Sequence, residues 1–265
     1  MEIKLPAIEA VTAIIEQEPL IQYVLHLADN SLVMGHRLSE WAGHGPLLEQ
    51  DIAMSNIALD HIGQSRNFYQ YASQLIGNEV SEDTLAYFRE ANQFKNCIIT
   101  ELPNGDWGKT IMKLFLFSTY QQLLYTALTS SKDTQIAAIA TKSLKEVLYH
   151  VRWSSEWVIR LGDGTENSRK RMINAVNEVW TYIEELFIPA SFEETAAGNG
   201  IGIALYSLHY PWFQKVSAIF SEATLDVPTS NVNQLKGKEG KHSEHLHVML
   251  IEMQILQRTY PGCEW

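Results

Sequence analysis

The stretch WGKTIMKLFLFSTYQQLLYTALTSS, residues 107–131, carries the most information about the fold of this chain. Its apolar side chains recur at spacings of three and four residues, which is typical of an α-helix. A turn over residues 102–106 precedes it, and residues 133–161 repeat the same spacing directly after it. No Asp or Glu occurs in the stretch, so this long helix cannot supply a carboxylate to a metal site.

The helical spacing dominates the rest of the chain as well, and the alternating pattern of β-strands is nearly absent. We expect helices over residues 19–42, 46–76, 81–94, 107–131, 133–161 and 166–187, within 206–225, and over 242–259, with a loop over 227–240. The sequence shows no repeat and no linker long enough to separate domains. It therefore predicts one all-α domain over residues 1–265, built on a four-helix bundle with additional helices.

Composition excludes several classes of function. The 20 Lys and Arg residues and the 31 Asp and Glu residues give a formal net charge of −11. This excess of acid argues against binding to nucleic acid or to anionic lipid. No apolar run approaches the roughly 20 residues that span a bilayer, and residues 1–6 lack the pattern of a secretory signal. Cys97 and Cys263 form no metal or disulfide motif, so we expect a cytoplasmic protein.

Long bundles often hold metal, and the ferritin-like di-iron pattern is one Glu from each of two helices and Glu-x-x-His from each of the other two. Here Asp60 is followed three residues later by Gly63. Glu146 precedes His150 by four residues, and Val147 stands where a Glu-x-x-His motif needs the acid. With the acid-free helix, these departures predict no catalytic residue, no metal and no cofactor in this chain.

The segment HSEHLH, residues 242–247, contains one Glu-x-x-His pair, Glu244 with His247. Several His and a Glu in six residues could bind zinc. The alternative is a solvated first helical turn, where acidic residues are favoured.

Several motifs along the chain are specific enough to suggest a family. They are LADN at 27–30, GHRLSEW at 35–41, GHGP at 43–46, DIAMSNIALD at 51–60, KEVLYH at 145–150, RLGDGT at 160–165 and EMQILQR at 252–258, with PG at 261–262 and Trp265 at the end. Together they resemble the C-subunit family of bacterial phenylacetyl-CoA epoxidases over nearly the whole chain.

This resemblance implies a ferritin-like, non-catalytic structural subunit of a multicomponent oxygenase in aerobic phenylacetate degradation. The partner that it implies is the catalytic A subunit, which carries the di-iron site, together with the other subunits of the complex. NADPH, flavin and iron–sulfur belong to the reductase subunit. A homodimer of this chain is a further assembly that the resemblance allows.

The resemblance also indicates a metal site that has been lost. Against the pattern of the A subunit, His61 and Gln64 replace a ligating Glu and His, and Val147 replaces a ligating Glu. Polar groups left in such a core need hydrogen-bond partners within the protein. The predicted vestigial metal site or core polar network comprises Asp29, Asn56, Asp60, His61, Gln64, Val147 and His150.

Two other functions remain open from the sequence. One is a self-sufficient di-iron or other metal-dependent oxidase, which the missing ligands oppose. The other is a zinc-binding module that uses Glu244 and His247.

Overall fold

The structure is a computed structural model that describes residues 8–77, 80–229, 236–261 and 263. Across these residues the regular structure is helical, apart from one isolated β-bridge between Lys236 and Lys241. This confirms the predicted all-α class. No helix in the described ranges is long and apolar enough to cross a membrane. Residues 230–235 of the predicted loop, and the family-motif residues Gly262 and Trp265, lie outside the described residues.

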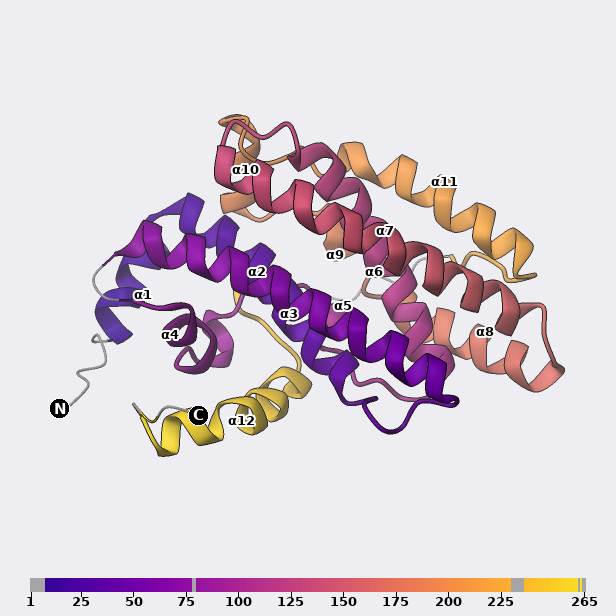
Figure 1. The fold of residues 1–265 in the computed structure, drawn as a ribbon. Helices are drawn as coiled ribbons and strands as arrows, with labels where there is room; N and C mark the ends of the chain where they lie inside the picture. The colour runs from indigo at the N-terminus through magenta and orange to yellow at the C-terminus, as the bar shows by residue number, and fades with distance from the viewer. Residues whose placement is uncertain (1–7, 78–79, 230–235, 262, 264–265) are drawn as a thin grey trace.

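Four long helices form the predicted ferritin-like bundle (Figure 1). They are α2 (Pro19–Ser39), α3 (Leu48–Ile76), α6 (Trp107–Leu128) and α7 (Thr134–Gly162), all close to their expected positions. Helix α2 packs along α3, α6 packs along α7, and α3 meets α7 across the bundle.

Local sequence explains where these helices begin. Pro19 occupies the first turn of α2, where its missing N–H costs nothing. The Asp106 carboxylate caps α6 by accepting from the Lys109 N–H at 2.9 Å. Asp133 caps α7 in the same way and also accepts a 2.5 Å hydrogen bond from the Tyr71 hydroxyl, which ties the end of α3 to the start of α7.

Shorter helices surround the bundle. They are α1 (Ile8–Gln17), α4 (Glu82–Tyr87), α5 (Ile98–Glu101), α8 (Glu166–Trp180), α9 (Glu184–Phe187), α10 (Ser191–Gly198), α11 (Tyr206–Glu222) and α12 (Glu244–Thr259). The sequence did not predict α1, α5 or α10. The continuous helices predicted over 81–94 and 166–187 were wrong, because each is interrupted.

Arg89 explains the first interruption. Its buried guanidinium pairs with Asp29 of α2 and donates to the backbone oxygens of Leu85 and Gln93. To bring Arg89 inward, the chain leaves α4 after Tyr87 and resumes only as a short 3-10 turn, Ala91–Gln93.

The second interruption follows from aromatic packing. After Trp180 the chain tightens into a turn in which the Ile183 N–H donates to the Trp180 carbonyl. Phe187 then lies edge-on against Tyr120 and packs on Trp212, at ring distances of 5.8 and 5.3 Å. These contacts need a change of direction that a continuous helix could not make.

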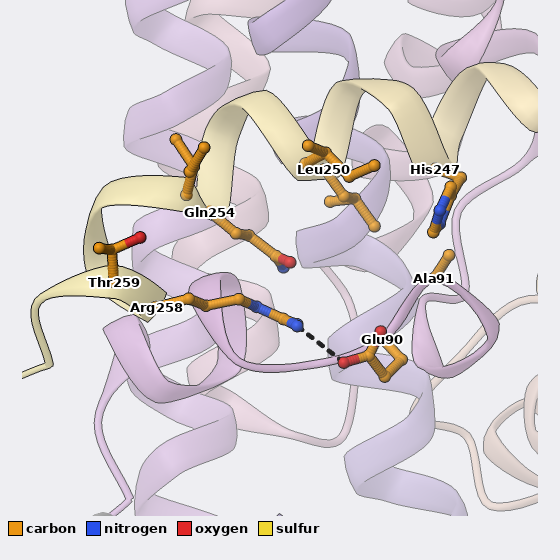
Figure 2. A pocket seen from close by; sticks show the side chains of 9 residues that line it. Glu90, Ala91, His247, Leu250, Gln254, Arg258 and Thr259 are labelled. Carbon is orange, nitrogen blue, oxygen red and sulfur yellow. Dashed lines mark hydrogen bonds and ion pairs between the residues drawn. The ribbon is translucent and has the colours of Figure 1, made fainter.

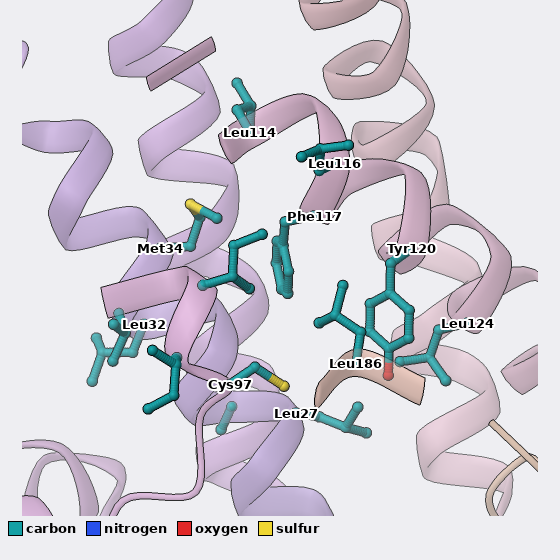
Figure 3. Close-up of a cluster of buried hydrophobic side chains, with 14 of the residues drawn as sticks. Leu27, Leu32, Met34, Cys97, Leu114, Leu116, Phe117, Tyr120, Leu124 and Leu186 are labelled. Carbon is teal, nitrogen blue, oxygen red and sulfur yellow. The ribbon is translucent and has the colours of Figure 1, made fainter. Parts of the chain in front are cut away.

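One hydrophobic core cluster draws side chains from α1 through α12. Its centre is α6, which is buried along almost its whole length. Figure 3 shows Phe117 and Tyr120 of α6 facing Leu27 and Met34 of α2, with Leu186 of α9 beside them. Helices α7, α8 and α11 cover the other sides of α6.

The C-terminal segment is fastened to this core by buried polar anchors. The Lys238 ammonium pairs with Glu193 at 2.9 Å, and both side chains are almost fully buried. His242 donates from Nδ1 to Glu101 at 2.8 Å and from Nε2 to the Phe94 carbonyl at 2.9 Å. Burial alone would lower the pKa of His242, but Glu101 and the Phe94 carbonyl raise it and so favour the imidazolium form, which can donate to both acceptors.

Two helical glycines provide a test of this packing. In Gly162→Ala the new Cβ would press on the carbonyl oxygen of Ala223 and lie 2.9 Å from its Cβ, so we expect a loss of about 1–3 kcal/mol in the free energy of unfolding. In Gly63→Ala the Cβ would meet nothing within 4 Å, so we expect a gain of about 1 kcal/mol from helix propensity alone.

Chemical denaturation of both variants measures these changes, and each variant controls for the other because both substitutions are Gly to Ala in long helices. Equal effects at the two positions would contradict the described contact between α7 and Ala223.

Candidate functional site

The first candidate site is the centre of the bundle, where a ferritin-like protein would hold metal. At this level α3 and α7 are joined by two polar contacts. His150 Nε2 lies 3.0 Å from an Asp60 oxygen, and Gln64 donates through Nε2 to Glu146 at 2.9 Å. His150 and Gln64 are buried, whereas Asp60 and Glu146 are half-buried. Partial burial raises the pKa of Glu146.

Helix α6 enters the same network through an amide. Gln121 donates to the Gln64 carbonyl oxygen at 3.2 Å and to the Tyr125 hydroxyl at 3.1 Å. Gln64 thus accepts from α6 and donates to α7, which no carboxylate could do. The amide replaces the charge that a metal centre needs with a neutral link among three helices.

His61 lies beside this network without joining it. Its ring centroid is 5.0 Å from that of His150 and 6.4 Å from that of Phe117. Both ring nitrogens are buried with no hydrogen-bond partner among the described residues, and burial lowers the pKa of His61 well below its usual value. Val147 is fully buried on the same side of α7 as His150. Because burial lowers the pKa of His61 so far, its imidazole is neutral at pH 7.

The structure brings together most, but not all, of the predicted network. Asp60, His61, Gln64, Val147 and His150 meet at the α3–α7 seam. Asn56 is exposed on the outer side of α3 and takes no part in it.

Asp29 belongs to a separate buried cluster. It accepts from the Tyr69 hydroxyl at 2.5 Å, from the Lys95 N–H at 2.8 Å and from the Arg89 guanidinium. Burial opposes the charge on Arg89, but Asp29 outweighs it and the pKa of Arg89 is raised. This ion pair is structural.

Residues that the sequence analysis left out of the network are Glu146, Gln121 and Tyr125. Glu146 stands in the KEVLYH motif, so a signal for it was present. Gln121 and Tyr125 are four residues apart and so lie on one face of the acid-free helix, but no local signal in the sequence predicts that this face contacts Gln64.

These side chains do not fit a conventional di-iron site. The carboxylates at the seam are Asp60 and Glu146, α6 adds only an amide and a phenol, and Val147 occupies a position where a ligand is expected. Among the described residues, no group of three or more His, Cys, Asp or Glu side chains is placed to hold a metal ion.

The second candidate site, at Glu244 and His247, is an open surface. Both side chains are exposed at the start of α12, and the nearby His242 is already bonded to Glu101. His247 lines a pocket of about 300 Å³ with Leu250 and Arg258. Figure 2 shows Arg258 reaching across this pocket to Glu90, and their ion pair measures 2.7 Å. The structure supplies Glu244 and His247 with no third ligand from the described chain.

Comparison with known proteins shows the family to which this chain belongs. The sequence profile described as "Phenylacetic acid catabolic protein" matches residues 7–265. The chain therefore belongs to the phenylacetic acid catabolic protein family. Within known proteins, it is 44% identical over 246 residues to the C subunit of 1,2-phenylacetyl-CoA epoxidase from Escherichia coli (strain K12). The match covers 93% of this chain and 99% of that protein, which confirms the resemblance found in the motifs.

Replacing His61 with Leu tests the description of the centre. At neutral pH we expect the free energy of unfolding to rise by about 1 kcal/mol, because two unpartnered buried nitrogens are removed. The gain should grow as the pH falls below about 6.5, because His61 of the wild type binds a proton in the unfolded state but not in the folded state.

Urea unfolding between pH 5 and 8 measures both effects. The exposed His247→Gln is the control and should change stability by less than about 0.5 kcal/mol. A His61→Leu variant that is less stable at every pH would show that the imidazole makes a hydrogen bond that the structure lacks.

Proposed function

We propose that this chain is the structural, non-catalytic subunit of a phenylacetyl-CoA epoxidase and supports a catalytic A subunit that holds the di-iron site. The 44% identity over nearly the full length of an epoxidase C subunit supports the place in the complex. In this proposal the oxygen chemistry and the reductase cofactors belong to the other subunits.

The observation that carries the non-catalytic role is the amide link at the bundle centre. Gln64 bonds at once to Gln121 and Glu146, so side chains of the protein link α3, α6 and α7 directly. A bundle that is complete on its own can serve as a rigid support, and rigid support is what the precise geometry of a neighbouring metal site requires.

Reconstitution tests this function. With the purified catalytic and reductase subunits, epoxidation of phenylacetyl-CoA should require this chain, and Glu146→Gln should retain activity within about twofold. The variant replaces the half-buried carboxylate by an amide whose oxygen still accepts from Gln64, so the fold is kept and a required metal ligand would be lost.

Iron should co-purify with the catalytic subunit after the chains are separated. Full epoxidation without this chain would contradict the supporting role. A loss of activity of about a hundredfold or more in the folded Glu146→Gln variant would contradict the non-catalytic role instead.

A further inference from the structure

Helix α3 leaves a stripe of large aliphatic side chains in solvent. Leu48, Ile52 and Leu59 are 72%, 53% and 66% exposed and follow one another at helical spacing along the outer side of α3. Single exposed leucines are ordinary, but an apolar row along one helix face is typical of a surface that a partner covers.

The exposed side of α7 continues this surface. The contacts Gln64–Glu146, Asp60–His150 and Trp157–Gln50 fix α3 and α7 side by side in antiparallel register. Their outer residues therefore form one face, which we call the α3/α7 face. It comprises Leu48, Ile52, Leu59 and Gly63 of α3 with Lys142, Lys145, Tyr149, Arg152, Glu156 and Arg160 of α7.

Gly63 marks a place for close approach on this face. It is exposed in the middle of α3, where glycine costs about 1 kcal/mol relative to alanine. A Cβ there would touch nothing within 4 Å, so the packing of this chain gives no reason for the glycine. A helix from another subunit that lies against α3 would give one.

The charges on the α3/α7 face indicate the kind of partner. Lys142, Lys145, Arg152 and Arg160 are exposed along α7, and no ion pair within the described residues involves any of them. Glu156 is the one exposed acid among these four cations on this side of α7, so the face carries an excess of positive charge on a chain whose net charge is −11. Unpaired cations beside an apolar stripe complement a surface that carries carboxylates around apolar side chains.

Two of these cations lie over aromatic rings. Arg152 is 5.8 Å from the ring centre of Tyr149, and Arg160 is 4.9 Å from that of Trp157. Arg, Tyr and Trp are the residue types that contribute most to binding at the centres of protein interfaces.

Other exposed apolar rows lack this combination. Helix α12 shows Val248, Ile251 and Ile255, but its Arg258 is paired with Glu90. Helix α11 shows Tyr206 and Tyr210 without a row of cations. A second copy of this chain is disfavoured on the α3/α7 face, because a twofold contact would bring the same cations together.

We propose that the α3/α7 face binds a helical partner subunit whose opposing surface carries aliphatic side chains bordered by Asp and Glu. This inference rests on the proposed function, in which that partner is the catalytic subunit.

The test measures binding of the purified full chain to the catalytic subunit. Ile52→Glu, Arg152→Glu and Gly63→Leu should each weaken binding by about tenfold or more. The matched controls Ile251→Glu on α12 and Tyr210→Glu on α11 alter exposed apolar residues on other faces and should change binding by less than about twofold. Thermal unfolding of each variant alone shows that it is folded, and Gly63→Leu should be at least as stable as the wild type.

Each contrary outcome has its own meaning. If the controls disrupt binding and the α3/α7 variants do not, the face is wrong and the proposed function stands. If the wild type does not bind the catalytic subunit at all, the proposed function fails and this inference falls with it. If the α3/α7 variants dissociate a homodimer in sedimentation and leave the complex intact, the occupant is a second copy and the proposal is overturned.

Discussion

The burial of α6 on almost every side is the constraint on which the structure depends. A helix with no solvent-facing stripe must be covered all round, and α7, α8 and α11 supply that cover while α2 and α3 close the bundle. A polar group on α6 then depends on partners within the protein, and the Ser118 and Tyr120 hydroxyls have none among the described residues. Lys113 shows the cost: burial lowers its pKa to about 7, and its Nζ donates to the Leu102 carbonyl at 2.7 Å.

The same constraint decides what the bundle centre can do. A metal pair needs inward carboxylates from facing helices, and α6 brings Gln121 and Tyr125 instead. An amide can donate and accept hydrogen bonds at the same time, so Gln64 and Gln121 link α3 and α6 directly. In a metal-containing bundle, carboxylates bound to the ion would make such a link. These amide contacts join α3, α6 and α7 through side chains of the protein itself.

The sequence predicted the long helices because their signals are local. Apolar spacing and the capping residues Asp106 and Asp133 lie within the segments that they define. The inward position of Arg89 could not be predicted from local signals, because its partner Asp29 is 60 residues away. The same holds for the bond between His242 and Glu101, which are 141 residues apart. In the site, substitutions such as Val147 were visible in the sequence, whereas the inward direction of Gln121 depended on how α6 is packed.

The centre and the outer face of α3 meet at the seam with α7. Asp60 and Glu146 are half-exposed there, yet they hold the buried His150 and Gln64. A partner bound over the seam would exclude water from Glu146, whose pKa burial already raises, and would favour its neutral form further. The neighbouring Lys142 acts in the opposite direction, because its charge favours the carboxylate. In the proposed complex the cations of α7 would thus have two roles on one face: the row would attract an acidic partner, and Lys142 would favour the charged form of Glu146 when water is removed.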